Sequence, residues 1–162
     1  MAARDALDAP PQRCENFPMK HYLKVPSIPR EESTVSILEH EVTVIGSRGR
    51  RRCRALFDSG ASYSIIRRDI AERIGRVDLL PVPEDWIFET AKAGNYVQAS
   101  GALRLDFRFD DSEAHFSDEF VVFDELSEEL IVGAKTMQAW KITLDFDEER
   151  VNYRKTAQRL RI

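Results

Sequence analysis

From about residue 35 onward, apolar and polar positions alternate in short runs, and this pattern predicts strands. HEVTVIG at 40–46 and RCRALF at 52–57 both alternate with a period of two. Between them lies SRGR, whose Gly49 is a residue that favours a turn. We therefore predict a hairpin at this point of the chain.

Similar runs continue toward the C-terminus. Residues 86–101 predict two strands joined at AGN, and residues 102–109 are expected to pair with 115–123 through a DDSE turn. Residues 141–154 predict a last hairpin. These runs make the pattern mostly β. The sequence contains no internal repeat.

Two short helices are expected among the strands. DIAERIG at 69–75 reads as a helix that starts at Asp69, a favourable N-terminal residue, and is closed by Gly75. IVGAKTMQAW at 131–140 reads as the end of a strand that leads into the second helix. Many short strands with two brief helices predict an all-β barrel or sandwich.

The first 34 residues differ from the rest of the chain. They are polar, lack helical or strand periodicity and contain five of the seven prolines, namely Pro10, Pro11, Pro18, Pro26 and Pro29. We predict an extended or disordered arm at 1–34 and a folded domain at 35–162. Packing along a neighbouring subunit and trimming after synthesis are alternatives that composition does not separate.

Composition narrows the class of protein. The chain has 162 residues, 43% hydrophobic and 32% charged, with a formal net charge of −4, which fits one soluble globular domain. An acidic balance argues against general affinity for nucleic acid or anionic membranes. The N-terminus carries charges at positions 4, 5 and 8 and no continuous apolar segment, so we expect no standard secretory signal and a cytoplasmic protein.

The cysteines and histidines give no sign of a metal site or a disulfide framework. Cys14 and Cys53 lie far apart and show no ligand spacing with His21, His40 or His115. We therefore expect neither a metal nor another cofactor, and a reducing compartment.

Other conspicuous residues have structural interpretations that we favour. The five arginines between 48 and 54 suit a solvated hairpin tip better than a nucleic-acid contact, and DELSEE at 124–129 suits a solvated loop better than a metal site. Trp86 and Trp140 are expected in the core, and His115 is expected to be a surface or hydrogen-bonded residue and not a base.

One stretch carries more specific chemistry. LFDSGA at 56–61 places Asp58 after an apolar run, SII follows at 64–66, and IVG follows much later at 131–133. A plain turn explains Asp-Ser-Gly alone. The two elements in this order, with a glycine-containing hairpin between them, resemble the retropepsin-like aspartic proteases, and the resemblance covers roughly residues 40–154.

The resemblance implies a fold and a reaction. The expected fold is all-β, a single-lobe closed barrel or sandwich that forms a homodimer. The expected reaction is hydrolysis of a peptide bond by water activated between two carboxylates that share one proton. We find no second copy of the motif, since Ser or Thr and then Gly does not follow any of Asp110, Asp111, Asp118, Asp124, Asp145 and Asp147. The second carboxylate must then be Asp58 of another copy.

The same resemblance assigns roles to neighbouring residues. Asp58 would be catalytic, with Ser59, Gly60 and Ala61 as the active-site loop. A flap that covers an extended peptide substrate would have its tip at Lys92, Ala93, Gly94 and Asn95. The strand Ile131, Val132 and Gly133 would support the Asp58 loop from beneath as the psi-loop.

Two features limit the comparison with retroviral members. Those members often have Arg and then Asp or Asn after the second glycine, whereas Ala134 and Lys135 follow Gly133 here. The C-terminal hairpin is more similar to retrotransposon and cellular members. An alternative function is a catalytically silent dimerisation or peptide-binding module of the same fold, and a nucleic-acid adaptor that uses the arginines ranks last.

Overall fold

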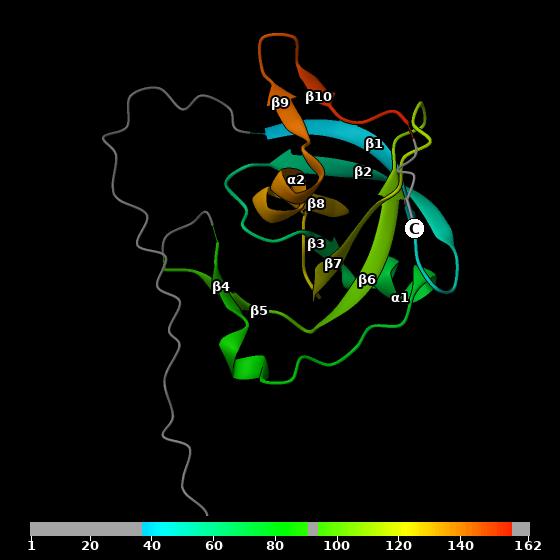
Figure 1. Cartoon of the computed structure of the whole chain (residues 1–162). Helices are drawn as coiled ribbons and strands as arrows, with labels where there is room; N and C mark the ends of the chain where they lie inside the picture. Colours follow the sequence, from blue (N-terminus) through cyan, green and yellow to red (C-terminus); the bar gives the residue numbers. More distant parts are fainter. Residues whose placement is uncertain (1–36, 91–93, 157–162) are drawn as a thin grey trace, which may run out of the picture.

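The computed structural model describes residues 37–90 and 94–156, and their main feature is a closed barrel of six strands (Figure 1). Around the barrel the strands follow the order β1-β2-β8-β3-β7-β6. Their bounds are β1 Ile37–Ile45, β2 Arg50–Asp58, β3 Ile65–Arg67, β6 Gly101–Arg108, β7 Phe116–Phe123 and β8 Leu130–Gly133. Most neighbours are antiparallel, but β2 pairs with β8 and β3 pairs with β7 in parallel.

Two hairpins and two helices surround the barrel. The hairpins are β4 (Ile87–Glu89) with β5 (Tyr96–Gln98), and β9 (Thr143–Asp145) with β10 (Arg150–Asn152). In the view of Figure 1 they lie on opposite sides of the barrel. The helices are α1 (Arg68–Ile74) and α2 (Ala134–Trp140), and a 3₁₀ turn spans Pro83–Asp85.

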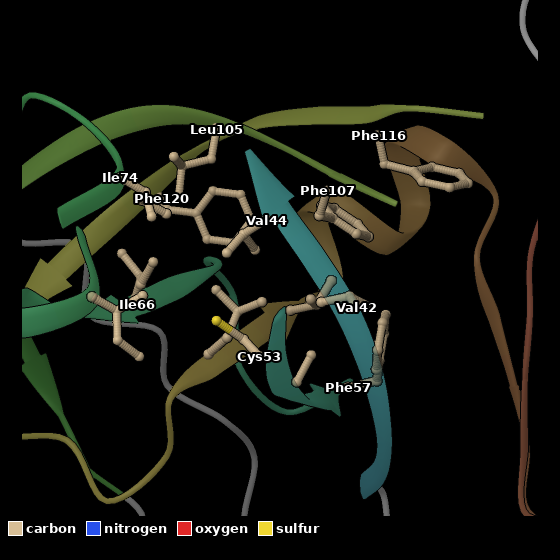
Figure 2. Packing of buried hydrophobic residues seen from close by; sticks show 14 of the residues in the cluster. Val42, Val44, Cys53, Phe57, Ile66, Ile74, Leu105, Phe107, Phe116 and Phe120 are labelled. Atoms are coloured by element: carbon tan, nitrogen blue, oxygen red, sulfur yellow. The ribbon is translucent and has the colours of Figure 1, made fainter. Parts of the chain in front are cut away.

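The barrel interior is packed with aromatic side chains (Figure 2). They come from the inward positions of β2, β6 and β7 and the residue after β6, and the largest fully buried ones are Phe57, Phe107, Phe109, Phe116 and Phe120. Each fully buried side chain of this size contributes roughly 1.5–3 kcal/mol relative to exposure. The core therefore holds the strands whose ends carry the candidate site.

Most predicted elements are confirmed. The hairpin at 40–57 forms β1 and β2, and its turn is closed by the Gly46 N–H, which donates to the Gly49 carbonyl at 2.8 Å. β6 pairs with β7 as expected, the final hairpin is present, and the all-β class holds. The strands expected at 86–101 are shorter than predicted, since β4 covers only Ile87–Glu89 and β5 only Tyr96–Gln98.

The predicted start of the first helix is wrong by one residue. The helix begins at Arg68 directly after β3, so Asp69 lies in the first turn and the N-cap is Arg67. Asp69 instead accepts a hydrogen bond from Arg67 Nε at 2.6 Å. Gly75 does close the helix, with its N–H donating to the Ala71 carbonyl at 2.9 Å. Its φ of −153° is ordinary extended backbone, and a Cβ there would lie 2.8 Å from Leu103 Cδ1, so a larger residue would require the Leu103 side chain to move.

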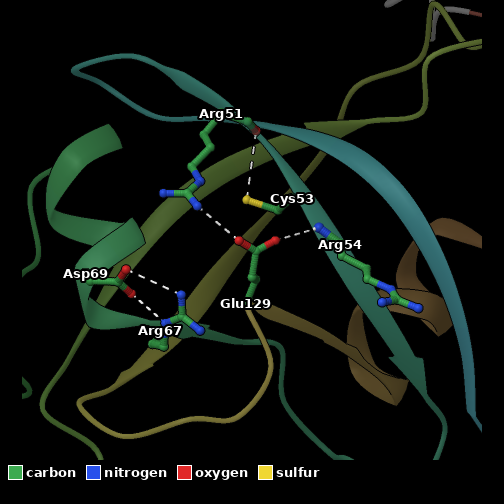
Figure 3. A network of polar contacts seen from close by, with 6 residues as sticks. All are labelled: Arg51, Cys53, Arg54, Arg67, Asp69 and Glu129. Atoms are coloured by element: carbon green, nitrogen blue, oxygen red, sulfur yellow. Dashed lines mark hydrogen bonds and ion pairs between the residues drawn. The ribbon is translucent and has the colours of Figure 1, made fainter.

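The arginine-rich strand is more engaged with the protein than a solvated tip would be (Figure 3). Arg51 donates to Glu129 Oε1 at 3.0 Å, and the Arg54 N–H donates to Glu129 Oε2 at 2.9 Å. The predicted solvated loop at 124–129 is therefore wrong for Glu129, which bridges this loop to β2. Beside it, Cys53 is buried, and desolvation raises the pKa of its thiol to about 11.

The expected arm at 1–34 lies outside the described residues. Within the part of the chain that the structure describes, no helix is long and apolar enough to cross a bilayer.

Candidate active site

Asp58 is the last residue of β2, at the rim of the barrel, and is half-buried. It faces Ile37 of β1 on one side and Gly133 of β8 on the other in the strand register. Its Oδ1 accepts the Gly60 N–H at 2.7 Å, and its carbonyl accepts the Ala61 N–H at 3.2 Å. The Asp-Ser-Gly turn is thus present, and the turn itself holds the carboxylate in one orientation.

The residues after Asp58 lie at the surface. Ser59 and Gly60 are exposed and Ala61 is half-buried. A Cβ on Gly60 would lie 3.1 Å from Asp58 Oδ1, so a larger residue would crowd the carboxylate. The loop keeps the carboxylate and its backbone donor accessible from outside the barrel.

The loop between β2 and β3 also caps helix α2. The first N–H groups of a helix have no partner within the helix, and α2 has no side-chain cap. Instead, the Ala134 N–H donates to the Ala61 carbonyl at 2.7 Å, and the Lys135 N–H donates to the Ser62 carbonyl at 3.3 Å. The helix and the Asp58 loop therefore stabilise each other.

Gly133 lies at the crossing of this loop and β8. A Cβ at that position would lie 2.4 Å from the Tyr63 carbonyl oxygen and 2.8 Å from the Ala61 carbonyl oxygen. Real Cβ atoms do not approach backbone this closely, so only glycine lets the loop pass over the strand. This contact places Ile131, Val132 and Gly133 beside the Asp58 strand, next to Leu56, Phe57 and Asp58 in register.

A buried hydroxyl pair lies behind the loop, and no sequence pattern links its two members, although Ser64 belongs to the SII stretch. Ser64 is 2% exposed and Thr136 is fully buried, with 2.5 Å between Ser64 Oγ and Thr136 Oγ1. Ser64 Oγ accepts the Gly133 N–H at 3.1 Å, and Thr136 Oγ1 donates to Asp118 Oδ2 at 2.5 Å. These residues are distant in sequence, so no local spacing links them.

The hairpin expected to be the flap is present as β4 and β5. Thr90 and Asn95 are joined by a backbone hydrogen bond of 2.9 Å beyond the strands, and the Gly94 N–H donates to Glu89 Oε1 at 3.0 Å. Gly94 has a φ of +77°, which favours glycine. Gly94 and Asn95 are exposed, whereas Lys92 and Ala93 lie outside the described residues.

Aromatic side chains connect the hairpin with the Asp58 loop. Tyr63 lies with its ring centroid 5.8 Å from that of Trp86 and 5.7 Å from that of Phe88. Lys135 Nζ lies 5.3 Å from the Tyr63 ring centroid, within cation–π range. Trp86 is half-buried in this cluster, in keeping with its predicted packing role.

The other candidate features lie elsewhere. A cavity of about 500 Å³ is lined by charged residues of β1 and β2 together with Asp110, Asp111 and Tyr153, and does not include Asp58. Among residues 37–90 and 94–156, no group of three His, Cys, Asp or Glu side chains is arranged to hold a metal ion. His115 is exposed, with Nδ1 3.8 Å from Asp106 Oδ2.

Asp58 thus offers one carboxylate per chain. Within the described part of the chain, no hydrogen bond or ion pair joins it to another titratable side chain. A single carboxylate can act as either an acid or a base in one step, but the pairing that splits two protonation affinities needs a second one.

Comparison with solved structures shows the fold. The chain is similar to the retroviral protease-like domain of Ddi1 from Leishmania major, with a TM-score of 0.56, 20% identity, and coverage of 74% of this chain and 89% of that domain. It is also similar to EIAV protease complexed with the inhibitor HBY-793, with a TM-score of 0.49, 15% identity, and coverage of 72% and 99%. No family model and no curated protein sequence matches the chain. The fold is therefore retropepsin-like.

Proposed function

We propose that this retropepsin-like chain is an aspartic endopeptidase whose active site forms between two copies of the chain. The observation that carries the proposal is Asp58 itself. It stands at the open end of a buried strand, its carboxylate is held by the Gly60 N–H at 2.7 Å, and the loop around it is fixed by Gly133. We assign the activity to the domain at 35–162.

Hydrolysis needs a base that takes a proton from water and an acid that donates one toward the scissile carbonyl oxygen. Two Asp58 carboxylates, one from each subunit of a symmetric dimer, would share a single proton and provide both groups, as is general for aspartic proteases. The pair titrates as a unit, so neither copy is the acid in advance. Because the shared proton must be retained, we expect activity to be highest at acidic to mildly acidic pH.

The surrounding elements have matching roles in this proposal. The exposed backbone at Ser59, Gly60 and Ala61 would border the substrate, and the strand Ile131, Val132 and Gly133 would hold the loop from behind. The β4–β5 hairpin, with its tip from Lys92 to Asn95, would close over an extended peptide that binds as an added strand. Closure would exclude bulk water from the reaction.

The test is the isosteric variant Asp58→Asn, assayed against a library of fluorogenic peptides from about pH 3 to about pH 8. We expect at least roughly a thousandfold loss of kcat, because Asn can neither take nor give the proton. Asp147→Asn is the matched control, since Asp147 is an exposed carboxylate in the β9–β10 turn. Circular dichroism and the unfolding midpoint verify that both variants are folded.

Two outcomes contradict the proposal. Wild-type rates from folded Asp58→Asn would exclude Asp58 as the catalytic group. A folded wild-type dimer without cleavage at any pH would favour the alternative of a silent peptide-binding or dimerisation module.

A further inference from the structure

The hydrogen bonds behind the Asp58 loop form a continuous chain from the surface of the barrel to the strand beside Asp58. It runs from Asp118 on β7 to Thr136 on α2, then to Ser64 at the end of the loop, and finally to the backbone of Gly133. Four separate elements therefore meet in this chain. Figure 1 shows α2 directly after β8, the strand at which this series of hydrogen bonds ends.

The direction of each of these three hydrogen bonds follows from the donor and acceptor capacities of the groups that form them. The Gly133 N–H can only donate, so Ser64 Oγ accepts it. The Thr136 hydroxyl has one proton, and it is donated to the Asp118 carboxylate. Ser64 must then donate its own proton to Thr136, which leaves all three bonds oriented toward Asp118.

Burial makes this chain costly to break. Ser64 and Thr136 are 2% and 0% exposed, so water cannot replace a missing partner at either hydroxyl. The Ser64 carbonyl also accepts the Val121 N–H of β7 at 2.9 Å, and the Trp140 indole N–H of α2 donates to the Ser117 carbonyl at 3.0 Å. The loop end, β7 and α2 are thus held together on both sides of the hydroxyl pair.

We infer that Asp118 is a positioning residue for the active-site loop, acting on Gly133 through Thr136 and Ser64. The inference rests on the proposed peptidase function for its kinetic consequence. An ionised acceptor strengthens a hydrogen bond, and bonds in series polarise one another. The Asp118 charge therefore tightens the Gly133 contact, which holds the end of β8 against the end of the Asp58 loop at Ser64.

No ion pair within the described residues neutralises Asp118. Opposite it on β6 is Leu105, and neither Arg104 and Asp106 on either side of Leu105 nor Glu119 on β7 forms an ion pair with it. Its second oxygen, Oδ1, accepts the Glu119 N–H at 2.8 Å. The carboxylate is thus anchored by its own strand and turned toward Thr136.

The experiment combines kinetics with NMR on the full chain. Asp118→Asn and Thr136→Val remove the charge and the hydroxyl with little change in shape, and Thr136→Ser restores the hydroxyl. We expect about a tenfold loss of kcat for the first two, with KM changed by less than about twofold, and recovery in Thr136→Ser. Glu119→Gln, an exposed carboxylate on the same strand, is the control expected to keep wild-type rates.

The NMR arm does not depend on activity. In Asp118→Asn and in Thr136→Val the Gly133 amide proton should lie upfield of its wild-type position, because its hydrogen bond to Ser64 Oγ weakens. Glu119→Gln should leave the Gly133 amide at its wild-type position. A change that only loosened the fold would alter many amides and the unfolding midpoint instead.

The outcomes separate this inference from the proposed function. An upfield Gly133 amide in Asp118→Asn, together with a wild-type protein that cleaves nothing, would support the hydrogen-bond chain and overturn the peptidase. Cleavage by the wild type, with equal rates and an unchanged Gly133 amide position in Asp118→Asn, would overturn the positioning role alone.

Discussion

Gly133 is the residue at which the packing of the site is tightest. A Cβ there would lie 2.4 Å from the Tyr63 carbonyl oxygen, which is backbone and cannot rotate away. We expect Gly133→Ala to lower the free energy of unfolding by about 3 kcal/mol, as overpacking does in a fixed interior. Urea unfolding followed by circular dichroism measures the change.

Gly49→Ala is the matched control for this substitution. Gly49 lies in the β1–β2 turn, where a Cβ would meet no atom within 4 Å. We expect its free energy of unfolding to change by less than about 0.5 kcal/mol. Equal losses in the two variants would mean that the effect reflects the intrinsic cost of replacing glycine and not the contact with the loop.

Cys53 should make the free energy of unfolding depend on pH in the alkaline range. Burial raises the pKa of its thiol from 9.0 to about 11, so the folded state holds the proton longer than the unfolded state. The resulting stability is fully present below pH 9.0 and is lost as the pH rises toward about 11. The loss is on the order of 2 kcal/mol, measured by urea unfolding across this range.

The control for this prediction removes the thiol. In a Cys14→Ser background, Cys53→Ala should be less stable at neutral pH but should lose less stability between about pH 9 and about pH 11 than the parent. Parallel curves for the two proteins would show that other groups cause the alkaline loss.

At the scale of elements, β8 is the strand on which the site depends. It is only four residues long, yet it pairs with both β2 and β3 and leads into α2. Glu129, immediately before it, accepts from Arg51 and from the Arg54 N–H, while its carbonyl accepts the Arg67 N–H at 3.3 Å. This residue therefore joins β2, β3 and β8 where their pairing begins.

Glu129→Ala tests this junction. The side chains of Glu129 and Arg51 are 30% and 33% exposed, so solvent screens their interaction and the expected loss of unfolding free energy is only about 1 kcal/mol. Faster amide exchange at Leu130 and Ala55 should accompany it, because these residues form the first register pair of β2 and β8.

Glu128→Ala is the comparison for this variant, since it removes a neighbouring carboxylate that forms no ion pair with a described residue. If Glu128→Ala were as destabilising as Glu129→Ala, the loss would arise from the net charge of the loop and not from the junction.

Elements could be predicted where a few consecutive residues carry the whole pattern that defines them. Alternation with a central glycine located the β1–β2 hairpin, and IVG before an amphipathic stretch located β8 and α2. The start of α1 was misplaced because β3 continues straight into the helix, so no capping residue marks the boundary. The local sequence predicts a solvated acid at Glu129, because the partners of its carboxylate are more than 70 residues away in sequence.

At the scale of the molecule, one carboxylate per chain makes the proposed activity depend on assembly. Mixing wild-type protein with Asp58→Asn should form heterodimers that hold one ionisable Asp58. At equal amounts, about a quarter of all dimers would have two wild-type subunits. Activity per total amount of protein should therefore fall to about a quarter of the wild-type value, and not to half. Peptide cleavage after re-equilibration of the mixture measures this.

Dilution is the companion measurement. Specific activity should fall below the dimer dissociation constant, in step with the loss of dimer mass in light scattering. Activity proportional to the wild-type fraction, or a fully active monomer, would contradict a site shared between subunits.

The sequence by itself determined the all-β class, the main strand pairs and the position of Asp58 within a turn, because each of these depends on neighbours a few residues apart. The family resemblance predicted that the strand at 131–133 supports the Asp58 loop, but only the tertiary structure decided how closely Gly133 meets that loop and that Asp118, Thr136 and Ser64 connect to it. These contacts join segments up to 72 residues apart. They follow from barrel closure, which brings β7, β8 and α2 together and leaves no periodic trace in the chain.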